Sequence, residues 1–589
     1  MPRAPTVILA AGIAVAIACA PAAGGASELV TPPPGDALAD APWVPDLGNG
    51  RYRNPVLAAD YSDPDVVRVG EDYYLTSSSF TNVPGLPILR SKDLVNWTLI
   101  GHALPRLLPI EHYAIPRRGG GVWAPSIRYH AGQFYIYYPD PDYGIYVVTA
   151  KNPAGPWTIP RLADASRGAI DPCPLWDDDG KAWLIFAWAK SRAGFNNVLT
   201  LKRLSADGMR TLGPSRVVVD GNRLAPAQTS AGPMGWEPIE GPKLYKRKGW
   251  YYIFAPAGGV RQGWEAVFRS RNIEGPYEGR DVLDQGHTDV NGPHQGAWVH
   301  TAQGEDWFLH FQDTDAYGRR VYLEPMRWRD GWPVIGRDTG DPGRGEPVLE
   351  YRKPETPAPV ARAVPRMSDE FDDHLSLAWQ WSANPRSDWM SLTAHPGFLR
   401  LNALPSPANL YQAGNLLTQK FPGPEFTVTA RMRLEPKAIG ERAGLLVFGN
   451  DYAWIGLAET TAGLRLVQDI RLGADRDRPQ VETAAIPVSD RPVYLRLHAR
   501  QVREPLPAPA GPRSSSNWPS NLREFSARVT FSYSLDGAHY IPLGKVFLAH
   551  QGPWVGSVFG LFAQLPSGAD SQVAAQPGYA EFDWLRVSR

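Results

Sequence analysis

The chain has 589 residues, and 60 lysines and arginines balance 60 aspartates and glutamates, so its formal net charge is zero. A chain of this length divides into two or more domains, and its neutral balance gives no electrostatic case for binding nucleic acid or an anionic membrane. Its 58 prolines, 57 glycines and 21 tryptophans are spread between short aromatic and β-branched runs. This composition favours tight turns between short strands, which is an all-β architecture.

The N-terminus has the pattern of a secretory signal peptide. One arginine precedes an apolar run over about residues 7–18, and small residues follow it. The run is shorter than the ~20 residues that a membrane span needs. We therefore expect residues 1–26 to be a signal peptide, with export to the periplasm or medium and no transmembrane segment; lipid attachment at Cys19 is the alternative. Cys173 is the only other cysteine, so the mature chain is expected to lack an internal disulfide.

One pattern returns five times in the first half of the chain. Each copy has a polar or small entrance with proline, an apolar strand, a polar turn with glycine and an aromatic-rich strand, as in "SDPDVVRVGEDYYLTSSS". The copies begin at Ser62, Trp123, Ile170, Ile239 and Gly292. Five such units at irregular spacing predict the blades of a five-bladed β-propeller. A β-sandwich of similar hairpins is the weaker alternative, because the order of features inside the unit is kept.

The entrances of the five units place ionisable residues at one end of the predicted central channel. The shared position holds Asp63, Ala124, Asp171, Glu240 and His294. Two or three carboxyl groups across a narrow pocket suit glycoside hydrolysis, which needs a protonated acid and an ionised base. A divalent cation such as Ca²⁺ is the competing use of the same cluster. Asp60 and Asp65, which flank the first entrance, are expected to make local hydrogen bonds.

The five units resemble glycoside hydrolase family 43, the inverting β-xylosidases and α-L-arabinofuranosidases. The resemblance covers roughly residues 54–336 and is carried in order by "NPVLAADYSDPDVVRVGEDYYLTSSSF", "GLPILRSKDLVNWTLIG", "WAPSI", "AIDPCPLWDDDG", "IEGPKLYK" and "PHQGAWV". It implies that Asp63 is the general base and Glu240 the general acid. Asp171 matches the residue that orients the acid and tunes its pKa.

The resemblance also implies contacts around the sugar. Trp123 and Phe80 are expected walls of the pocket, with core packing as the alternative for both. Arg319 matches a sugar-contacting arginine, although the segment here reads Arg-Arg-Val and Arg320 is a second candidate. His294 is expected to line the substrate site and matches a channel histidine that supports calcium through water; a packed core histidine is the alternative. No cofactor is expected to be required, and structural Ca²⁺ is the metal implied.

The second half of the chain changes character. Residues 346–365 are rich in proline and are expected to link a propeller catalytic domain, residues 27–345, to a second domain, residues 366–589. Alternating strands such as "RVTFSYSLDGAHYIPLG" predict a β-sandwich. In this position it is similar to the concanavalin-like accessory domain of two-domain xylosidases, which can narrow the pocket to exo-type cleavage. Binding of polysaccharide as a separate module is its alternative role.

These features predict an exported, exo-acting, inverting hydrolase that releases xylose from β-xylosides or xylo-oligosaccharides. The expected partners are plant cell-wall oligosaccharides or polysaccharides such as xylan and arabinoxylan. An α-L-arabinofuranosidase acting on arabinoxylan or arabinan side chains is the alternative activity. A carbohydrate-binding protein without catalysis is the alternative from another class, and the presence of all three carboxyl groups argues against it.

Overall fold

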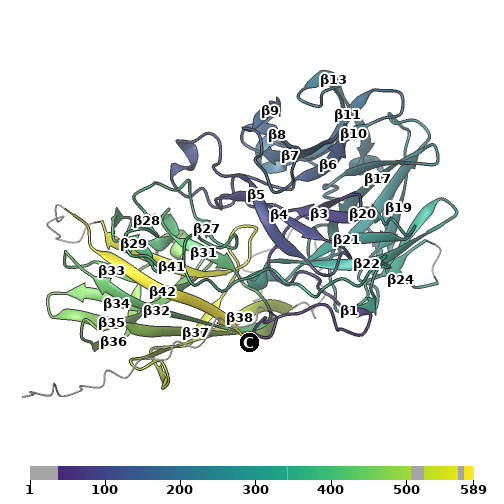
Figure 1. Ribbon diagram of the computed structural model, residues 1–589. Helices are drawn as coiled ribbons and strands as arrows, with labels where there is room; N and C mark the ends of the chain where they lie inside the picture. The colour runs from purple at the N-terminus through teal and green to yellow at the C-terminus, as the bar shows by residue number, and fades with distance from the viewer. Residues whose placement is uncertain (1–37, 341–342, 506–522, 568–575) are drawn as a thin grey trace, which may run out of the picture. The chain divides into compact units, whose positions relative to one another are not determined.

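The computed structural model describes residues 38–340, 343–505, 523–567 and 576–589. The predicted signal peptide and Cys19 lie outside these residues. Almost all regular structure is β-sheet (Figure 1), as predicted from the composition. Its short helices are α1 (Lys190–Ala193), η1 (His112–Ala114), η2 (Gly221–Arg223), η3 (Asp315–Tyr317), η4 (Leu410–Gln412) and η5 (Ala474–Arg476). Within the described ranges, no helix is both long and apolar enough to cross a bilayer.

Five sheets, each built from four consecutive antiparallel strands, form a propeller over residues 65–335, all of which are described (Figure 1). The first two blades are β2 (Asp65–Val69), β3 (Asp72–Thr76), β4 (Gly85–Ser91) and β5 (Thr98–Leu104), then β6 (Ser126–His130), β7 (Gln133–Asp140), β8 (Gly144–Ala150) and β9 (Arg161–Asp164). The third is β10 (Ala169–Trp176), β11 (Ala182–Trp188), β12 (Val198–Leu204) and β13 (Thr211–Asp220). The last two are β16 (Lys243–Arg247), β17 (Trp250–Ala257), β18 (Trp264–Ser270) and β19 (Glu278–Leu283), then β20 (His294–His300), β21 (Asp306–Asp313), β22 (Arg319–Arg329) and β23 (Trp332–Ile335). The predicted five-bladed propeller is therefore confirmed.

The first strand of each blade begins where the repeated sequence unit predicts it. Each first strand pairs with the aromatic-rich second strand through a tight turn, and glycines such as Gly70 (φ 63°) and Gly249 (φ 72°) supply the left-handed backbone that these turns need. The strand β2 lies beside β6 and β20, and β10 lies beside β6 and β16. This ring of first strands brings their entrances to one end of the channel. Between the third and fourth blades the hairpin β14 (Ala227–Thr229) and β15 (Gly232–Met234) is inserted.

The segment before the first blade closes the ring of blades. Leu57 and Val321 of the fifth blade exchange two backbone hydrogen bonds, of 3.3 and 3.0 Å. The hydroxyl of Tyr52 donates to the carbonyl of Leu323 at 2.7 Å, and the Asn54 amide donates to the same carbonyl at 2.9 Å. Because Tyr52 is completely buried, the closure is both polar and apolar.

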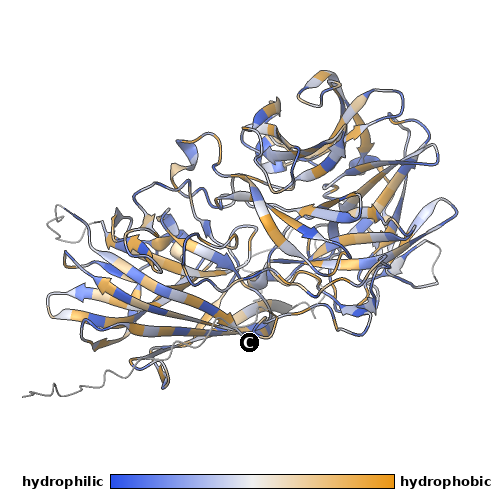
Figure 2. Ribbon diagram, viewed as in Figure 1, coloured by the Kyte–Doolittle hydropathy of each residue, from blue (hydrophilic) through white to orange (hydrophobic). Residues whose placement is uncertain are grey.

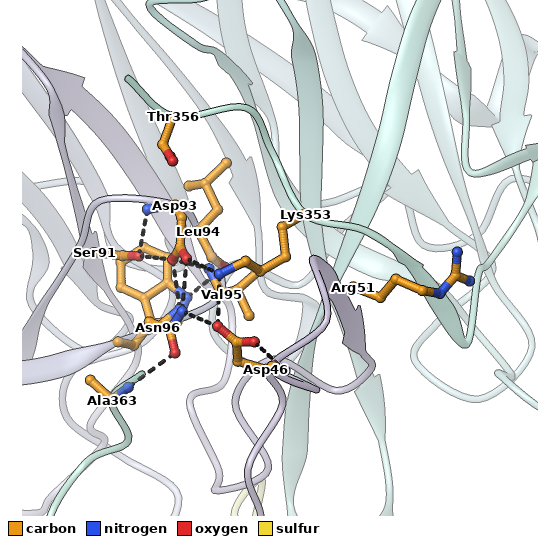
Figure 3. Close-up of polar contacts among 12 residues, drawn as sticks. Asp46, Arg51, Ser91, Asp93, Leu94, Val95, Asn96, Lys353, Thr356 and Ala363 are labelled. Atoms are coloured by element: carbon orange, nitrogen blue, oxygen red, sulfur yellow. Dashed lines mark hydrogen bonds and ion pairs between the residues drawn. The ribbon is translucent and has the colours of Figure 1, made fainter. Parts of the chain in front are cut away.

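The start of the predicted proline-rich linker pairs with the propeller. The strands β24 (Arg337–Asp338) and β25 (Gly345–Glu346) extend the fourth blade, and β26 (Glu350–Arg352) pairs with β1 (Arg51–Arg53). Next in the chain, Lys353 donates its Nζ to Asp46 Oδ2 at 2.7 Å and to Asp93 Oδ2 at 3.1 Å (Figure 3). Asn96 bonds both carboxylates through its amide, at 2.8 and 2.7 Å. The linker is therefore anchored to the first blade through a buried charged network.

The C-terminal domain is a sandwich of two sheets, as predicted. One sheet contains β27 (Gln380–Trp381), β31 (Leu417–Lys420), β41 (Val558–Pro566), β33 (Arg442–Phe448), β34 (Tyr452–Thr460), β35 (Gly463–Arg471) and β36 (Val481–Pro487), with β30 (Pro405–Ser406) beside β41. The other contains β28 (Met390–Ser391), β29 (Leu399–Asn402), β42 (Tyr579–Ser588), β32 (Glu425–Glu435), β37 (Val493–Pro505), β38 (Arg523–Ser534) and β39 (Ile541–Pro542), with β40 (Phe547–Ala549) on β38. Hydropathy alternates along these strands (Figure 2), and on β32 the residues Phe426, Val428 and Ala430 are buried in the core between the sheets.

Hydrogen bonds join the propeller to the sandwich. Val83 and Trp381 exchange two backbone hydrogen bonds, of 2.9 and 2.6 Å. The side chain of Asn384 accepts from the backbone N–H of Leu107 at 2.8 Å and donates to the carbonyl of the same residue at 3.0 Å. These buried contacts make the two domains one packed unit.

Candidate active site

Asp63 lies directly before β2 and is held by three donors. Its Oδ1 accepts from Arg319 Nη1 at 2.8 Å, and its Oδ2 accepts from the hydroxyls of Ser62 at 2.7 Å and Ser78 at 2.5 Å. A carboxylate has about four acceptor positions, so one position on Oδ1 is left for another donor. The buried Asp63 is thus oriented with one acceptor position free.

The two aspartates at the repeated entrance position share an uncommon backbone conformation. Asp63 has φ 54° and Asp171 has φ 55°, both in the left-handed region, and the pairing of β10 with β11 shifts between Ile170 and Cys173. Each such residue is strained by roughly 1–3 kcal/mol, and strain of this kind gathers at functional sites. The equal angles at equivalent positions are what the internal repeat predicts.

Glu240 lies before β16, and its carboxyl contacts the first residue of β20. Its Oε1 is 2.9 Å from Nε2 of His294. The Glu240 side chain is 27% exposed, whereas that of His294 is completely buried. The histidine is therefore packed against the carboxyl, and the substrate contact expected from the sequence stays a prediction.

Asp171 connects to the same carboxyl through the backbone and through charge. Its Oδ2 accepts from the N–H of Gly241 at 2.7 Å, which fixes the residue that follows Glu240. Burial, reinforced by the charge of Glu240 and then by that of Asp63, raises the pKa of Asp171 to about 8. When two carboxyls interact this strongly, the proton belongs to the pair. Asp171 is buried, whereas the Glu240 side chain is 27% exposed.

The two candidate arginines point in different directions. The Arg319 guanidinium contacts Asp63 and donates to the hydroxyl of Ser62 at 3.0 Å. Arg320 donates to Gln501 of the sandwich at 2.7 Å. Because successive side chains of a strand face opposite ways, only Arg319 of these two lies at the cluster of carboxyls.

Aromatic residues of both domains meet next to the entrance of the second blade. Phe80 exchanges two backbone hydrogen bonds with Val122, of 2.8 and 3.0 Å, and this brings the nearly buried Phe80 beside Trp123. The Trp123 ring lies edge-on to that of Trp554 from the sandwich, with centroids 6.2 Å apart. Trp554 is 55% exposed and has φ 66°. Sequence reasoning missed Trp554; its place in the glycine- and proline-rich segment "QGPWVGS" is the one signal that could have found it.

His294 offers a ring nitrogen that could support a metal ion through water. Among the described residues, no group of three or more His, Cys, Asp or Glu side chains could hold a metal ion. The Nδ1 of His294 is buried and has no hydrogen-bond partner among the residues that the structure describes. A buried ring nitrogen without a partner fits a water molecule in the shell of a cation.

The flanking aspartates Asp60 and Asp65 make long-range contacts, so the prediction that their hydrogen bonds are local is wrong. Asp65 Oδ2 accepts from the backbone N–H of Ile127 at 2.7 Å and from Arg128 Nη1 at 2.6 Å, which ties the first blade to the second. Asp60 accepts from Arg319 of the fifth blade and from Gly556 of the sandwich. Both carboxylates join segments that are distant in the sequence.

Comparison with known proteins identifies the family. Residues 52–333 match the family model Glycosyl hydrolases family 43, and residues 368–508 match the Beta xylosidase C-terminal Concanavalin A-like domain. A putative beta-xylosidase of Xylanibacter ruminicola is 38% identical over 512 residues, covering 87% of this chain and 86% of that protein. The chain belongs to glycoside hydrolase family 43.

Two further family 43 proteins show the range of similarity. A non-reducing end alpha-L-arabinofuranosidase of Bacteroides ovatus is 32% identical over 435 residues, covering 69% of this chain and 75% of that protein. The crystal structure of the GH43 BlXynB protein from Bacillus licheniformis superposes with a TM-score of 0.74 at 25% identity, covering 91% of this chain and 99% of that protein. The similarity to both therefore extends over most of the two-domain chain.

Proposed function

We propose that this family 43 hydrolase is an exo-acting, inverting β-xylosidase that releases xylose from the ends of xylo-oligosaccharides. The observation that carries the proposal is the cluster of Asp63, Asp171 and Glu240 at one end of the channel, where the charges of the other two act on Asp171. The name of the 38% identical relative, a putative beta-xylosidase, supports xyloside as the substrate. Xylan and arabinoxylan are the polymers from which such ends would come.

The base side of the reaction follows from the contacts of Asp63. Its three donors leave one acceptor position on Oδ1, and a water molecule placed there would give its proton to the carboxylate as its oxygen bonds to the anomeric carbon. Arg319 holds the same oxygen at 2.8 Å, which fixes the direction of attack. Because this water attacks directly, the sugar would leave with inverted configuration.

The acid side follows from Glu240 and its two neighbours. With its proton on Nε2, His294 donates to Oε1 of Glu240, which leaves Oε2 to protonate the departing oxygen as the glycosidic bond breaks. Asp171 orients the same segment through Gly241. Its charge favours retention of one proton by the pair. A proton retained by the pair would reach the departing oxygen through Glu240, whose side chain is 27% exposed.

Exo action is supported by the border that the sandwich gives to the site. Pro553 and Trp554 lie against Gly119, and Trp554 contacts Trp123. A pocket bordered by a second domain accepts the end of a chain more readily than its middle. An aromatic pair of this kind also offers a ring face and edge to a sugar.

Release of α-L-arabinofuranose is the second candidate activity, because the Bacteroides ovatus relative is named as an arabinofuranosidase. We also propose export, which the N-terminal apolar run supports. His294 would hold a calcium ion through water on Nδ1, and the ion would add positive charge to the channel. We propose that neither the xylosidase nor the arabinofuranosidase activity requires the calcium ion.

The test is hydrolysis of 4-nitrophenyl β-xyloside, 4-nitrophenyl α-L-arabinofuranoside and xylobiose, with the first anomer released followed by NMR. We expect β-xyloside cleavage with α-xylose appearing first. Release of β-xylose first would refute inversion, and preference for the arabinoside would establish the second activity. Binding of xylobiose without cleavage of any substrate would refute the enzyme and favour a binding protein.

A further inference from the structure

Asp60 is a buried carboxylate that the proposed reaction does not use. It lies three residues before Asp63 and is 7% exposed. Its Oδ1 accepts from the backbone N–H of Arg319 at 3.0 Å, and its Oδ2 accepts from the backbone N–H of Gly556 at 2.9 Å. One carboxylate thus joins the fifth blade of the propeller to a loop of the sandwich.

Both partners of Asp60 belong to segments that shape the site. The guanidinium of Arg319 holds Asp63, so Asp60 fixes the backbone from which that guanidinium extends. Gly556 follows Trp554 by two residues, and Trp554 contacts Trp123. The position of the base and the aromatic border therefore depend on the same side chain.

The backbones around Asp60 leave no room for another arrangement. A Cβ atom on Gly318 would lie 2.3 Å from Cγ of Asp60, and one on Gly556 would lie 2.5 Å from the nitrogen of Gly318. The N–H of Ser557 donates to the carbonyl of Ala316 at 2.7 Å. Glycines at both positions let the sandwich loop lie directly on the blade loop, with Asp60 beneath them.

The sandwich supplies a second contact from Lys420, at the end of β31. Its Nζ donates to the backbone carbonyl of Asp60 and lies 4.8 Å from the ring centroid of Tyr61. Burial lowers the pKa of Lys420, and the charge of Asp60 opposes this change. The segment that leads into the base is therefore held by the sandwich at both its backbone and its side chain.

We propose that Asp60 is a positioning residue through which the sandwich aligns the catalytic base with the aromatic border of the site. Its carboxylate acts through Arg319 on Asp63 and through Gly556 on Trp554. The inference rests on the proposed function, because it assigns Asp63 as the base. It gives the sandwich a part in the chemical step as well as in bordering the pocket.

The test is Asp60→Asn, compared with the matched control Asp369→Asn. An amide can accept from one of the two backbone donors, but its NH₂ group then faces the other. Asp369 is buried in the sandwich and likewise accepts from backbone N–H groups, of Phe371 at 3.0 Å and Ser376 at 2.8 Å, with no contact to the site. We expect Asp60→Asn to lower kcat about 10- to 100-fold, since small misplacements of reacting groups have large effects. The control should lower Tm and leave kcat and KM unchanged.

Two further measurements separate positioning from general destabilisation. In Asp60→Asn, the backbone amides of Arg319 and Gly556 should exchange hydrogen for deuterium faster, and in the control these two amides should keep the wild-type rate. The double variant Asp60→Asn with Trp554→Ala should have nearly the KM of Trp554→Ala alone, because both changes act on the same border. Lys420→Met provides a second variant that keeps the carboxylate, with a smaller loss of kcat expected.

Wild-type kcat and KM in Asp60→Asn, with Tm lowered as in the control, would overturn the proposal. Unchanged exchange at both amides would also overturn it. If Asp60→Asn does not fold, a wild-type kcat in Lys420→Met would overturn the proposal instead. Amide exchange is measured without substrate, so a wild-type protein that hydrolyses no glycoside would refute the proposed function while the exchange result still decides whether Asp60 holds the two loops.

Discussion

Replacing Asp171 with asparagine removes one of two interacting carboxyls and keeps the shape of the side chain. The amide oxygen can still accept from the N–H of Gly241, which lies 2.7 Å from the wild-type carboxylate, so the segment that carries the acid should keep its place. What the variant loses is the titratable carboxyl beside Glu240. The effect should therefore appear in the pH dependence of turnover more than in substrate binding.

The size of the effect follows from the pKa of about 8 at Asp171. In the wild type, the proton of the pair is lost as the pH rises through about 8, which sets the alkaline limb of kcat/KM. In Asp171→Asn, the carboxyl whose pKa is raised is gone, so the alkaline limb should move to lower pH. A displacement of about two pH units would lower kcat/KM at pH 7 about tenfold and leave it nearly unchanged at pH 4.5.

The assay is the pH profile of kcat/KM for both proteins from about pH 4 to 9, with Tm recorded in the same buffers. Because the folded-state pKa of Asp171 lies above its ordinary value of 3.8, ionisation opposes folding as the pH rises from that value to about 8. Asp171→Asn should therefore raise Tm at pH 7 and leave it nearly unchanged below pH 3.8. An alkaline limb at the wild-type position in the variant would refute the electrostatic role of Asp171.

Three further predictions concern the other residues of the site. Asp63→Asn and Glu240→Gln should each lower kcat by about 100- to 10,000-fold while Tm stays within a few degrees; wild-type-like rates in either variant would remove that residue from the mechanism. Trp554→Ala removes an aromatic ring that borders the site, and a ring–sugar contact as strong as an aromatic pair, about 0.5–1.5 kcal/mol, would raise KM about 2- to 13-fold when lost; an unchanged KM would place Trp554 outside the site. Since the side chain is 55% exposed, the change in Tm should be small. His294→Ala should lower kcat about tenfold or more in chelator-treated and calcium-supplemented protein alike, because its contact with Glu240 is direct; a loss confined to the calcium-supplemented protein would assign His294 to the ion instead.

The internal repeat made most of the fold predictable. The order of features inside each unit was sufficient for the propeller and for the shared position of Asp63, Asp171 and Glu240, and period-2 alternation was sufficient for the sandwich. The partners of individual polar residues could not be predicted in this way. Asp60 bonds to residues 259 and 496 positions away, and nothing in its local sequence marks either one.

The choice between Arg319 and Arg320 shows a second kind of gap. Adjacent residues of a strand face opposite sides, so the choice depends on the register of β22. The motif does not fix this register, because the segment here reads Arg-Arg-Val. Trp554 was missed because it comes from the other domain and no repeat or alternation distinguishes it. The burial of His294 depends likewise on packing by several blades, and no single blade's sequence specifies it.

The two backbone hydrogen bonds between Val83 and Trp381 have a consequence for how this protein could diversify in evolution. A propeller separated from its sandwich would expose these groups together with the donors and acceptors that Asn384 satisfies. Recombination that swaps one sandwich for another would have to reproduce such bonds as well as a hydrophobic surface. We therefore expect the two domains to be inherited together, so that substrate preference changes by substitution within the pair rather than by shuffling of its halves.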